Sequence, residues 1–306
     1  MKKIIYITFT LMILKVSAQD QLSISQYMYH QPFLNPGAMS SYNNWNGAVF
    51  YNNQWIGIDG APTFFGFTAS NPLDESNAVG LTFFQDNIGI DTKTDLTGDY
   101  AYNLKINNES NLGLGIGATW RNMKSNFNKI QVNDENDPEF SGGIQTKNFF
   151  NMRFGAFYYR DRFYGGLMAP SILNNKINYD NGYNGKTYIS FSEIHWLLQL
   201  GYQFDLNDVW DLNVSTFVKE ARGASVQVDL NTLLSYKDLF GFGLSYRTNQ
   251  DLLFLANVSF EHFWKVGYAY TYGFNKLSTY TSGSHEIILV FNMIKPNSSK
   301  IIIPRF

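Results

Sequence analysis

The chain has 306 residues, of which 16% are charged and 17% aromatic, with 20 Tyr, 26 Phe and 6 Trp. Soluble domains carry about a quarter charged residues, so this composition points to surroundings other than water alone. The absence of cysteine excludes disulfides, thiolate metal ligands, a cysteine nucleophile and a lipid-modified N-terminal cysteine. The slight excess of acidic residues argues against nucleic acid as a partner.

The chain begins with the pattern of a secretory signal peptide. Lys2 and Lys3 precede an apolar run over residues 4–14, and Val-Ser-Ala at 16–18 supplies the small residues of a cleavage site. We expect residues 1–18 to be removed, which leaves 20 basic against 25 acidic residues and a formal charge of about −5. A retained membrane anchor is the alternative, although the apolar run is short for a span.

Residues 19–44 carry aromatic side chains but show no sustained alternation. Asn35-Pro36-Gly37 is a turn signal within this segment. Large apolar side chains here, such as Tyr27, Met28 and Phe33, are poorly placed in water. We therefore expect the segment to lie as a plug in the lumen of the barrel that the following residues predict. A docking tail in the periplasm is the alternative.

From residue 45 onward, apolar and small or polar residues alternate with the period of a β-strand. In the run 112–120, Leu114, Ile116 and Trp120 share one face with other apolar side chains, while glycines and Thr119 share the opposite face. The second face holds glycine, small residues and single charges: Asp99, Lys105, Arg121, Arg153, Asp211, Lys219 and Arg247. A large apolar face opposite a small or polar one is typical of a transmembrane barrel, which must close on itself in lipid.

About fourteen segments show this pattern: 46–54, 63–71, 77–86, 94–106, 111–124, 147–160, 162–171, 187–204, 209–220, 224–236, 239–248, 251–262, 263–274 and 284–294. The sequence therefore predicts an all-β fold, a transmembrane antiparallel β-barrel over residues 45–306 that ends in a periplasmic tail. A soluble array of β-sandwiches is the alternative, but it would need linkers that the sequence does not show.

The connections alternate in length, which supports a barrel. Those after the fourth, sixth, eighth, tenth and twelfth segments are tight, whereas those after the fifth and seventh are long. Long loops lie outside the cell in such barrels. We therefore expect the barrel in the outer membrane, in contact with lipid, with residues 55–62 on the outer side and both termini in the periplasm.

The sequence predicts no enzyme and no cofactor. The four histidines have no metal-ligand spacing, and Ser284 and His285 are strand neighbours, so their side chains point to opposite faces. The acidic loop 134–139 has hard oxygen ligands for calcium but not the twelve-residue calcium-loop pattern. We expect a solvated loop there, with a calcium site as the alternative.

Two blocks of residues carry a family resemblance. The early block holds a Gln-Tyr-Met run, an Asn-Pro turn and then Gln-Trp-x-Gly-x-x-Gly-Ala-Pro, at Gln26, Tyr27, Met28, Asn35, Pro36, Gln54, Trp55, Gly57, Gly60, Ala61 and Pro62. The late block is Ser-Gly-Ser-His-Glu-Ile at 282–287, with Ser284, His285 and Glu286. Together they resemble the PorP/SprF family of outer-membrane proteins linked to the type IX secretion system of Bacteroidetes.

This resemblance implies a fourteen-stranded barrel similar to long-chain fatty-acid transporters. It also implies a role in the export or surface attachment of a secreted adhesin or gliding protein that carries a type IX C-terminal sorting domain. Periplasmic parts of the secretion apparatus are further implied partners. The motif residues are then expected to contact the plug or the partner. An outer-membrane channel for small or hydrophobic solutes is the alternative function.

Overall fold

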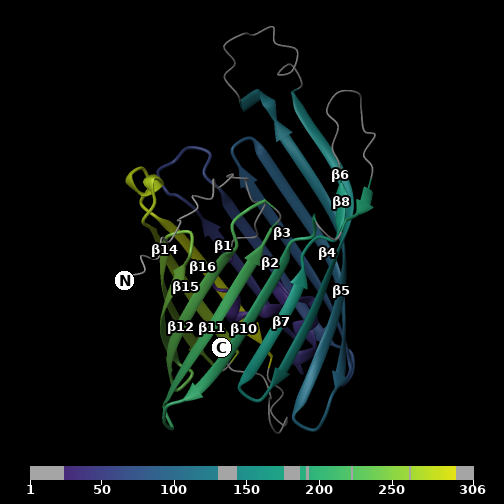
Figure 1. Cartoon of the computed structure of the whole chain (residues 1–306), viewed down its shortest axis with the longest axis vertical. Helices are drawn as coiled ribbons and strands as arrows, with labels where there is room; N and C mark the ends of the chain where they lie inside the picture. Colours follow the sequence, from purple (N-terminus) through teal and green to yellow (C-terminus); the bar gives the residue numbers. More distant parts are fainter. Residues whose placement is uncertain are drawn as a thin grey trace, which may run out of the picture.

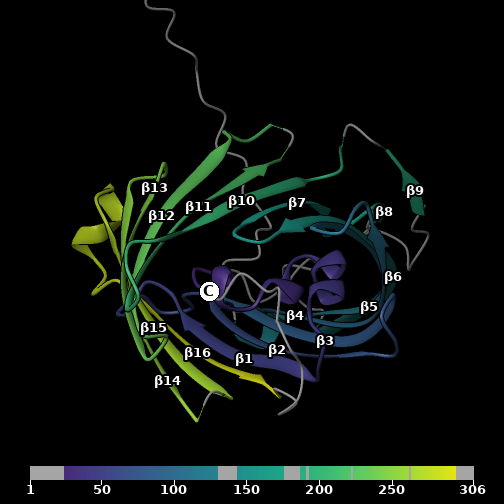
Figure 2. The ribbon, with the colours of Figure 1, turned by 90° about the horizontal axis from the view of Figure 1, so that it is seen from below.

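A computed structural model of the chain describes residues 24–129, 143–175, 187–190, 193–221, 223–261 and 263–293. These residues form a closed antiparallel barrel of 14 strands, in which the first strand pairs with the last (Figures 1 and 2). The strands are β1 (Asn46–Asn53), β2 (Thr63–Pro72), β3 (Asn77–Ile88), β4 (Asp91–Lys105), β5 (Ser110–Asn126), β6 (Ile144–Arg160), β7 (Phe163–Ala169), β10 (Trp196–Asp205), β11 (Trp210–Glu220), β12 (Gln227–Tyr236), β13 (Phe240–Arg247), β14 (Asp251–Phe260), β15 (Trp264–Gly273) and β16 (Ser284–Asn292). The predicted fold class is confirmed.

One predicted strand is shorter than expected. The segment 187–204 does not run as one strand, because β10 begins at Trp196 and residues 187–189 form β9 (Thr187–Ile189), which pairs with β8 (Leu173–Asn175) outside the barrel. The neighbouring strand β7 ends at Ala169, directly before Pro170. Proline has no N–H to continue a ladder, so β10 has no β7 partner beyond the pair Leu197–Met168.

The two ends of the barrel differ in their connections. At one end, here the turn end, the connections after β2, β4, β6, β10, β12 and β14 have two to four residues each. The opposite end, here the loop end, carries the long connections after β5 and β7. This is the alternation that the sequence predicts. The acidic loop 134–139 lies outside the described residues.

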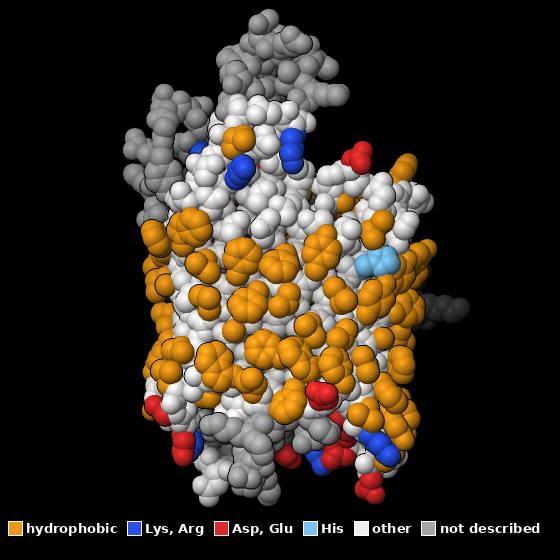
Figure 3. Space-filling view, turned by 180° about the vertical axis from the view of Figure 1, so that it is seen from behind, with side chains coloured by type: hydrophobic (Ala, Val, Ile, Leu, Met, Phe, Trp, Pro, Cys, Tyr) orange, Lys and Arg blue, Asp and Glu red, His pale blue; other side chains and the backbone are white. Residues whose placement is uncertain are grey.

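The outer surface of the barrel is an apolar band. Side chains on alternate strand positions face outward, and Figure 3 shows the orange side chains in a belt with charged side chains gathered above and below it. Outward residues such as Leu114, Ile116 and Trp120 are 38%, 45% and 38% exposed. Such a belt suits the hydrocarbon region of a bilayer.

Residues 24–44, here called the plug, lie inside the barrel (Figure 2). The plug folds into three short 3-10 turns, Tyr27–Tyr29, Gln31–Phe33 and Pro36–Ser41. All of residues 24–39 are buried. Within the described part of the chain, no helix has both the length and the apolar character needed to cross a membrane.

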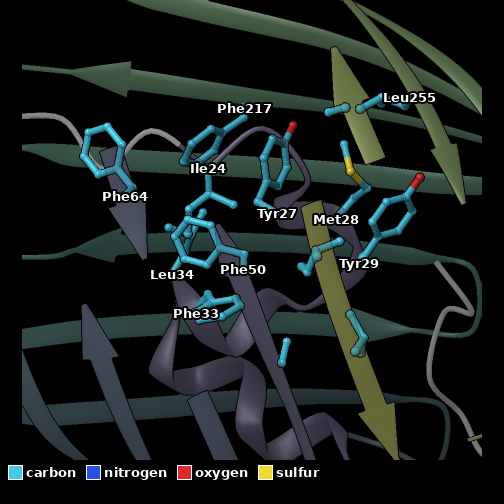
Figure 4. Packing of buried hydrophobic residues seen from close by; sticks show 14 of the residues in the cluster. Ile24, Tyr27, Met28, Tyr29, Phe33, Leu34, Phe50, Phe64, Phe217 and Leu255 are labelled. Carbon is cyan, nitrogen blue, oxygen red and sulfur yellow. The ribbon is translucent and has the colours of Figure 1, made fainter. Parts of the chain in front are cut away.

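The core of the molecule is the contact between the plug and part of the barrel wall (Figure 4). Plug side chains including Tyr27, Met28 and Phe33 pack against inward-facing Phe50 and Phe217 and their neighbours. Each large apolar side chain fully removed from water contributes about 1.5–3 kcal/mol. Apolar burial therefore holds the plug in the lumen.

Candidate functional site

The start of the plug is bound by an acidic residue on the last strand. Glu286 on β16 is 1% exposed, and its carboxylate accepts hydrogen bonds from the backbone N–H groups of Ser25 and Gln26 at 2.9 Å. It also accepts from Asn52 Nδ2 on β1 at 2.8 Å. Buried backbone donors need an acceptor, and Glu286 supplies it. Gln26, Glu286 and the strand β1 are thus brought together.

Two tyrosines bind the plug to β12 and β14, which follow β16 and β15 around the ring. Asn231 Nδ2 on β12 donates to Tyr27 Oη at 2.5 Å, and Asn257 Nδ2 on β14 donates to Tyr29 Oη at 2.9 Å. The ring of Tyr27 also lies 4.6 Å from that of Phe217. Burial raises the pKa of Tyr29 well above its usual range, so its phenol stays neutral.

His30 is a buried plug residue that sequence reasoning did not single out. Its ring lies 5.5 Å from that of Phe33 and 5.7 Å from that of Tyr42. Neither ring nitrogen has a hydrogen-bond partner among the described residues. Burial lowers the pKa of His30 to about 3, so the ring is neutral near pH 7.

The Asn35-Pro36 turn rests against glycines of the barrel wall. Asn35 Oδ1 accepts from Gly37 N at 2.9 Å, and Asn35 Nδ2 donates to the carbonyl of Ala156 on β6 at 3.0 Å. A Cβ at Gly155 would fall within 3.0 Å of Asn35 Oδ1. Glycine is needed here because the plug backbone approaches the strand closely. A Cβ at Gly113 or Gly115 on β5 would likewise come within 3.0 Å of Gly37 in this turn.

A buried ion pair binds the middle of the plug. Arg153 on β6 contacts Asp99 on β4 through Nε at 2.7 Å and Nη2 at 2.5 Å. Arg153 Nη1 donates to the carbonyl of Phe33 at 3.1 Å, and Nη2 donates to Thr82 Oγ1 at 2.9 Å. The guanidinium thus connects the plug to β3, β4 and β6.

The hairpin that joins β1 and β2 lies at the loop end and contacts the connection before β16. Gln54 N donates to Pro62 O at 2.9 Å, and Trp55 N donates to Ser284 Oγ at 3.1 Å. Trp55 is 40% exposed and has a φ of +47°. The early and late sequence blocks are therefore in contact at the rim.

Two glycines allow this hairpin its path. Gly57 has a φ of +103° and Gly60 a φ of +73°, both in the region that favours glycine. Gly60 O accepts from Gly89 N in the turn between β3 and β4 at 2.9 Å. Ile56 N donates to Gly283 O at 2.9 Å. The hairpin is thereby joined to a neighbour on each side.

Ser284 and His285 point to opposite faces of β16. Ser284 faces the cavity described next, whereas His285 Nδ1 lies 2.5 Å from Tyr268 Oη among outward residues. They do not form a nucleophile and base. Among the described residues, no group of three His, Asp or Glu side chains could hold a metal ion.

A cavity of about 250 Å³ opens above the plug at the loop end. Four motif residues from distant parts of the chain line it: Gln54, Trp55, Pro62 and Ser284. Ser25, at the start of the plug and hydrogen-bonded to Glu286, lines it as well. Lys219 and Arg247 add charged groups to its wall. The alternation of the sequence places these side chains inward but gives no signal that they meet.

A second cavity of about 170 Å³ adjoins the first, and the two share Phe64 and Asp86. Phe33, Leu34 and Phe84 give it an apolar floor. Its walls are charged, with Arg121 bound to Asp95 through two contacts of 2.7 Å. The loop end therefore offers both polar and apolar binding surface.

The family described as "Type IX secretion system membrane protein PorP/SprF" matches residues 16–291. No curated protein matches the sequence. Among solved structures, the CymD monoaromatic hydrocarbon channel is 11% identical, with 87% of this chain and 93% of that chain covered and a TM-score of 0.52. The P. putida toluene transporter TodX is 10% identical, with 86% of this chain and 94% of that chain covered and a TM-score of 0.47. A Pseudomonas aeruginosa FadL homologue is 12% identical, with 84% of this chain and 92% of that chain covered and a TM-score of 0.47. The likeness to CymD is one of fold.

Proposed function

Because the chain belongs to the PorP/SprF family of type IX secretion system membrane proteins, we propose that its barrel receives a secreted protein at the loop end and holds it on the cell surface. The protein is an outer-membrane component associated with that secretion system, and its family is not an enzyme family. The proposed partner is an adhesin or gliding protein with a type IX C-terminal sorting domain.

One observation carries this proposal. The early and late sequence blocks meet at the loop-end cavity, while the plug beneath it is hydrogen-bonded to strands around the ring. Such a plug obstructs the lumen and leaves a shaped surface at one end. This arrangement suits a receptor for a protein better than a conduit.

The orientation completes the proposal. The loop end faces outward, where a secreted partner is found, and the turn end faces the periplasm, where secretion-system components can contact it. The signal peptide over residues 1–18 directs export. These assignments follow the loop lengths and the N-terminal pattern.

Deletion of the gene tests the proposal. Cells that lack it are compared with cells that carry it back on a plasmid, and surface and medium proteins are measured by quantitative mass spectrometry. We expect at least one secreted protein to leave the surface fraction and to return on complementation. An unchanged set of surface proteins would contradict the proposed function.

A channel for small or hydrophobic solutes is the second candidate, and the apolar floor of the second cavity favours it. Phe33, Leu34 and Phe84 there would suit an apolar solute. Conductance of the purified barrel in planar bilayers separates the two candidates. Large steady currents support a channel, and silence supports a plugged receptor.

A further inference from the structure

Lys219 on β11 is a buried cation that forms no salt bridge with any acid in the described part of the chain. It is 3% exposed and lines the loop-end cavity. Its ammonium lies 5.2 Å from the centre of the Phe217 ring, and no hydrogen bond or ion pair joins it to another residue in the described ranges. Lysine is almost never fully buried unless it is paired, because an unpaired ammonium is costly to remove from water. The cavity therefore holds a cation in need of an acceptor.

The nearest acid on the same wall is already bound. Asp229 lies on β12, next to β11, and accepts from Arg247 Nε at 3.1 and 3.2 Å. It also accepts from Gln227 Nε2 at 2.8 Å. Arg247 itself retains an Nη2 that has no hydrogen-bond partner among the residues that the structure describes. The Asp229–Arg247 pair thus leaves the charge of Lys219 without a direct contact.

The other acids around the cavity are also accounted for. Glu286 is bound to the plug and to Asn52. Asp251 lies 3.8 Å from Arg247 Nη1. Asp86 is on β3, on the opposite side of the ring from β11. None of the three forms an ion pair with Lys219, so the side of the cavity near β11 can accommodate an added anion.

We propose that this cavity binds a carboxylate group of a ligand, held by Lys219 Nζ. The hydroxyl groups of Ser25 and Thr271 line the same cavity and can donate to the second oxygen. A volume of about 250 Å³ holds a chain end or a side chain but not a folded domain. The carboxylate comes either from the secreted partner, which rests on the proposed function, or from a small free acid.

Succinate titration of the full-length protein in detergent tests the site. Trp55 lines the cavity, so its fluorescence reports binding. Loss of the fluorescence change in the Trp55→Phe variant identifies Trp55 as its source. We expect saturable binding by the wild type, at least tenfold weaker binding by Lys219→Met, and binding within about threefold of wild type by Lys219→Arg. Neutral succinamide should not bind, and Lys105→Met, at the turn end, should behave as wild type.

Failure of the wild type to saturate, or equal succinate binding by Lys219→Met, would overturn the inference. Heat-modified electrophoresis checks that each variant forms the barrel. A surface-display measurement then separates the sources. Loss of the secreted partner in Lys219→Met cells assigns the carboxylate to the partner, and retained partner with lost succinate binding assigns it to a free acid. Gene deletion without effect on surface proteins would contradict the proposed function while leaving the succinate result intact.

Discussion

Both oxygens of the Glu286 carboxylate accept the backbone N–H of Ser25, at 3.1 and 2.9 Å, although the two residues are 261 positions apart. The contact joins the start of the plug to the strand that closes the barrel. It lies directly beneath the loop-end cavity that Ser25 helps to line. Plug position and the shape of the proposed receiving surface are therefore linked through one side chain.

Glu286→Gln should loosen the start of the plug. The amide keeps the shape but replaces one charged acceptor by a donor that faces N–H groups, and hydrogen bonds to charged groups are worth about 1.5–3 kcal/mol. The chain has no cysteine, so Ser25→Cys provides a single thiol for a polar maleimide. We expect labelling at least tenfold faster in the Gln variant. Glu75→Gln, at an exposed position, is the control. Equal labelling rates in the Glu286→Gln and Glu75→Gln variants would contradict the role of Glu286 in holding the start of the plug.

Gly155→Ala should displace the Asn35 turn, because the added Cβ would overlap Asn35 Oδ1. Overpacking costs about 1–3 kcal/mol. Gly98→Ala is the matched control, since a Cβ on that β4 glycine meets nothing within 4 Å. The midpoint temperature of thermal unfolding should be lowered in Gly155→Ala and unchanged in Gly98→Ala. A wild-type midpoint for Gly155→Ala would mean that the plug does not seat against this strand.

Arg153→Met should destabilise the protein strongly. It leaves Asp99, whose side chain is 0% exposed, as an uncompensated buried charge and frees the Phe33 carbonyl. Breaking a buried pair in this way costs about 3–5 kcal/mol. Adding Asp99→Asn to Arg153→Met should restore part of the lost free energy of unfolding, as measured by denaturant titration. Arg160→Met, which breaks an exposed pair with Glu109, should have little effect; the ion-pair account fails if the two single variants behave alike.

Acid should release the plug through His30. Burial lowers the pKa of His30 to about 3 from its ordinary value of 6.5. The folded pKa lies below the unfolded one, so the stabilising contribution is complete above pH 6.5 and is lost as pH falls toward 3, at about 1.4 kcal/mol per pH unit. Maleimide reacts with the thiolate, so labelling slows in acid for every variant; at pH 5, Ser25→Cys with His30 present should therefore be labelled faster than Ser25→Cys with His30→Leu. His30→Leu should remove this part of the acid sensitivity, and an identical pH profile in both would argue against it.

The sequence predicts the barrel because side chains in a barrel wall alternate between apolar and small or polar with a period of two residues. This alternation can be recognised in a single segment such as 112–120. The sequence also predicts a plug from Tyr27 and Phe33. It does not predict the contacts that bind the plug. The sequence places Arg153 and Asp99 on the inward face as single charges but does not pair them. Glu286 is 261 residues from Ser25, so their contact has no local signal either. Such pairings depend on the register of strands around the ring, which local alternation does not contain.

A photo-crosslinking amino acid at position 55 tests the central claim most directly. Trp55 lines the loop-end cavity and is 40% exposed, whereas Leu244, 50% exposed on the outer face of β13, serves as the control position. In living cells, the account predicts an ultraviolet-dependent adduct between position 55 and a secreted surface protein, with no such adduct from position 244. Absence of a secreted protein in the position 55 adducts, from a barrel that assembles normally, would contradict it.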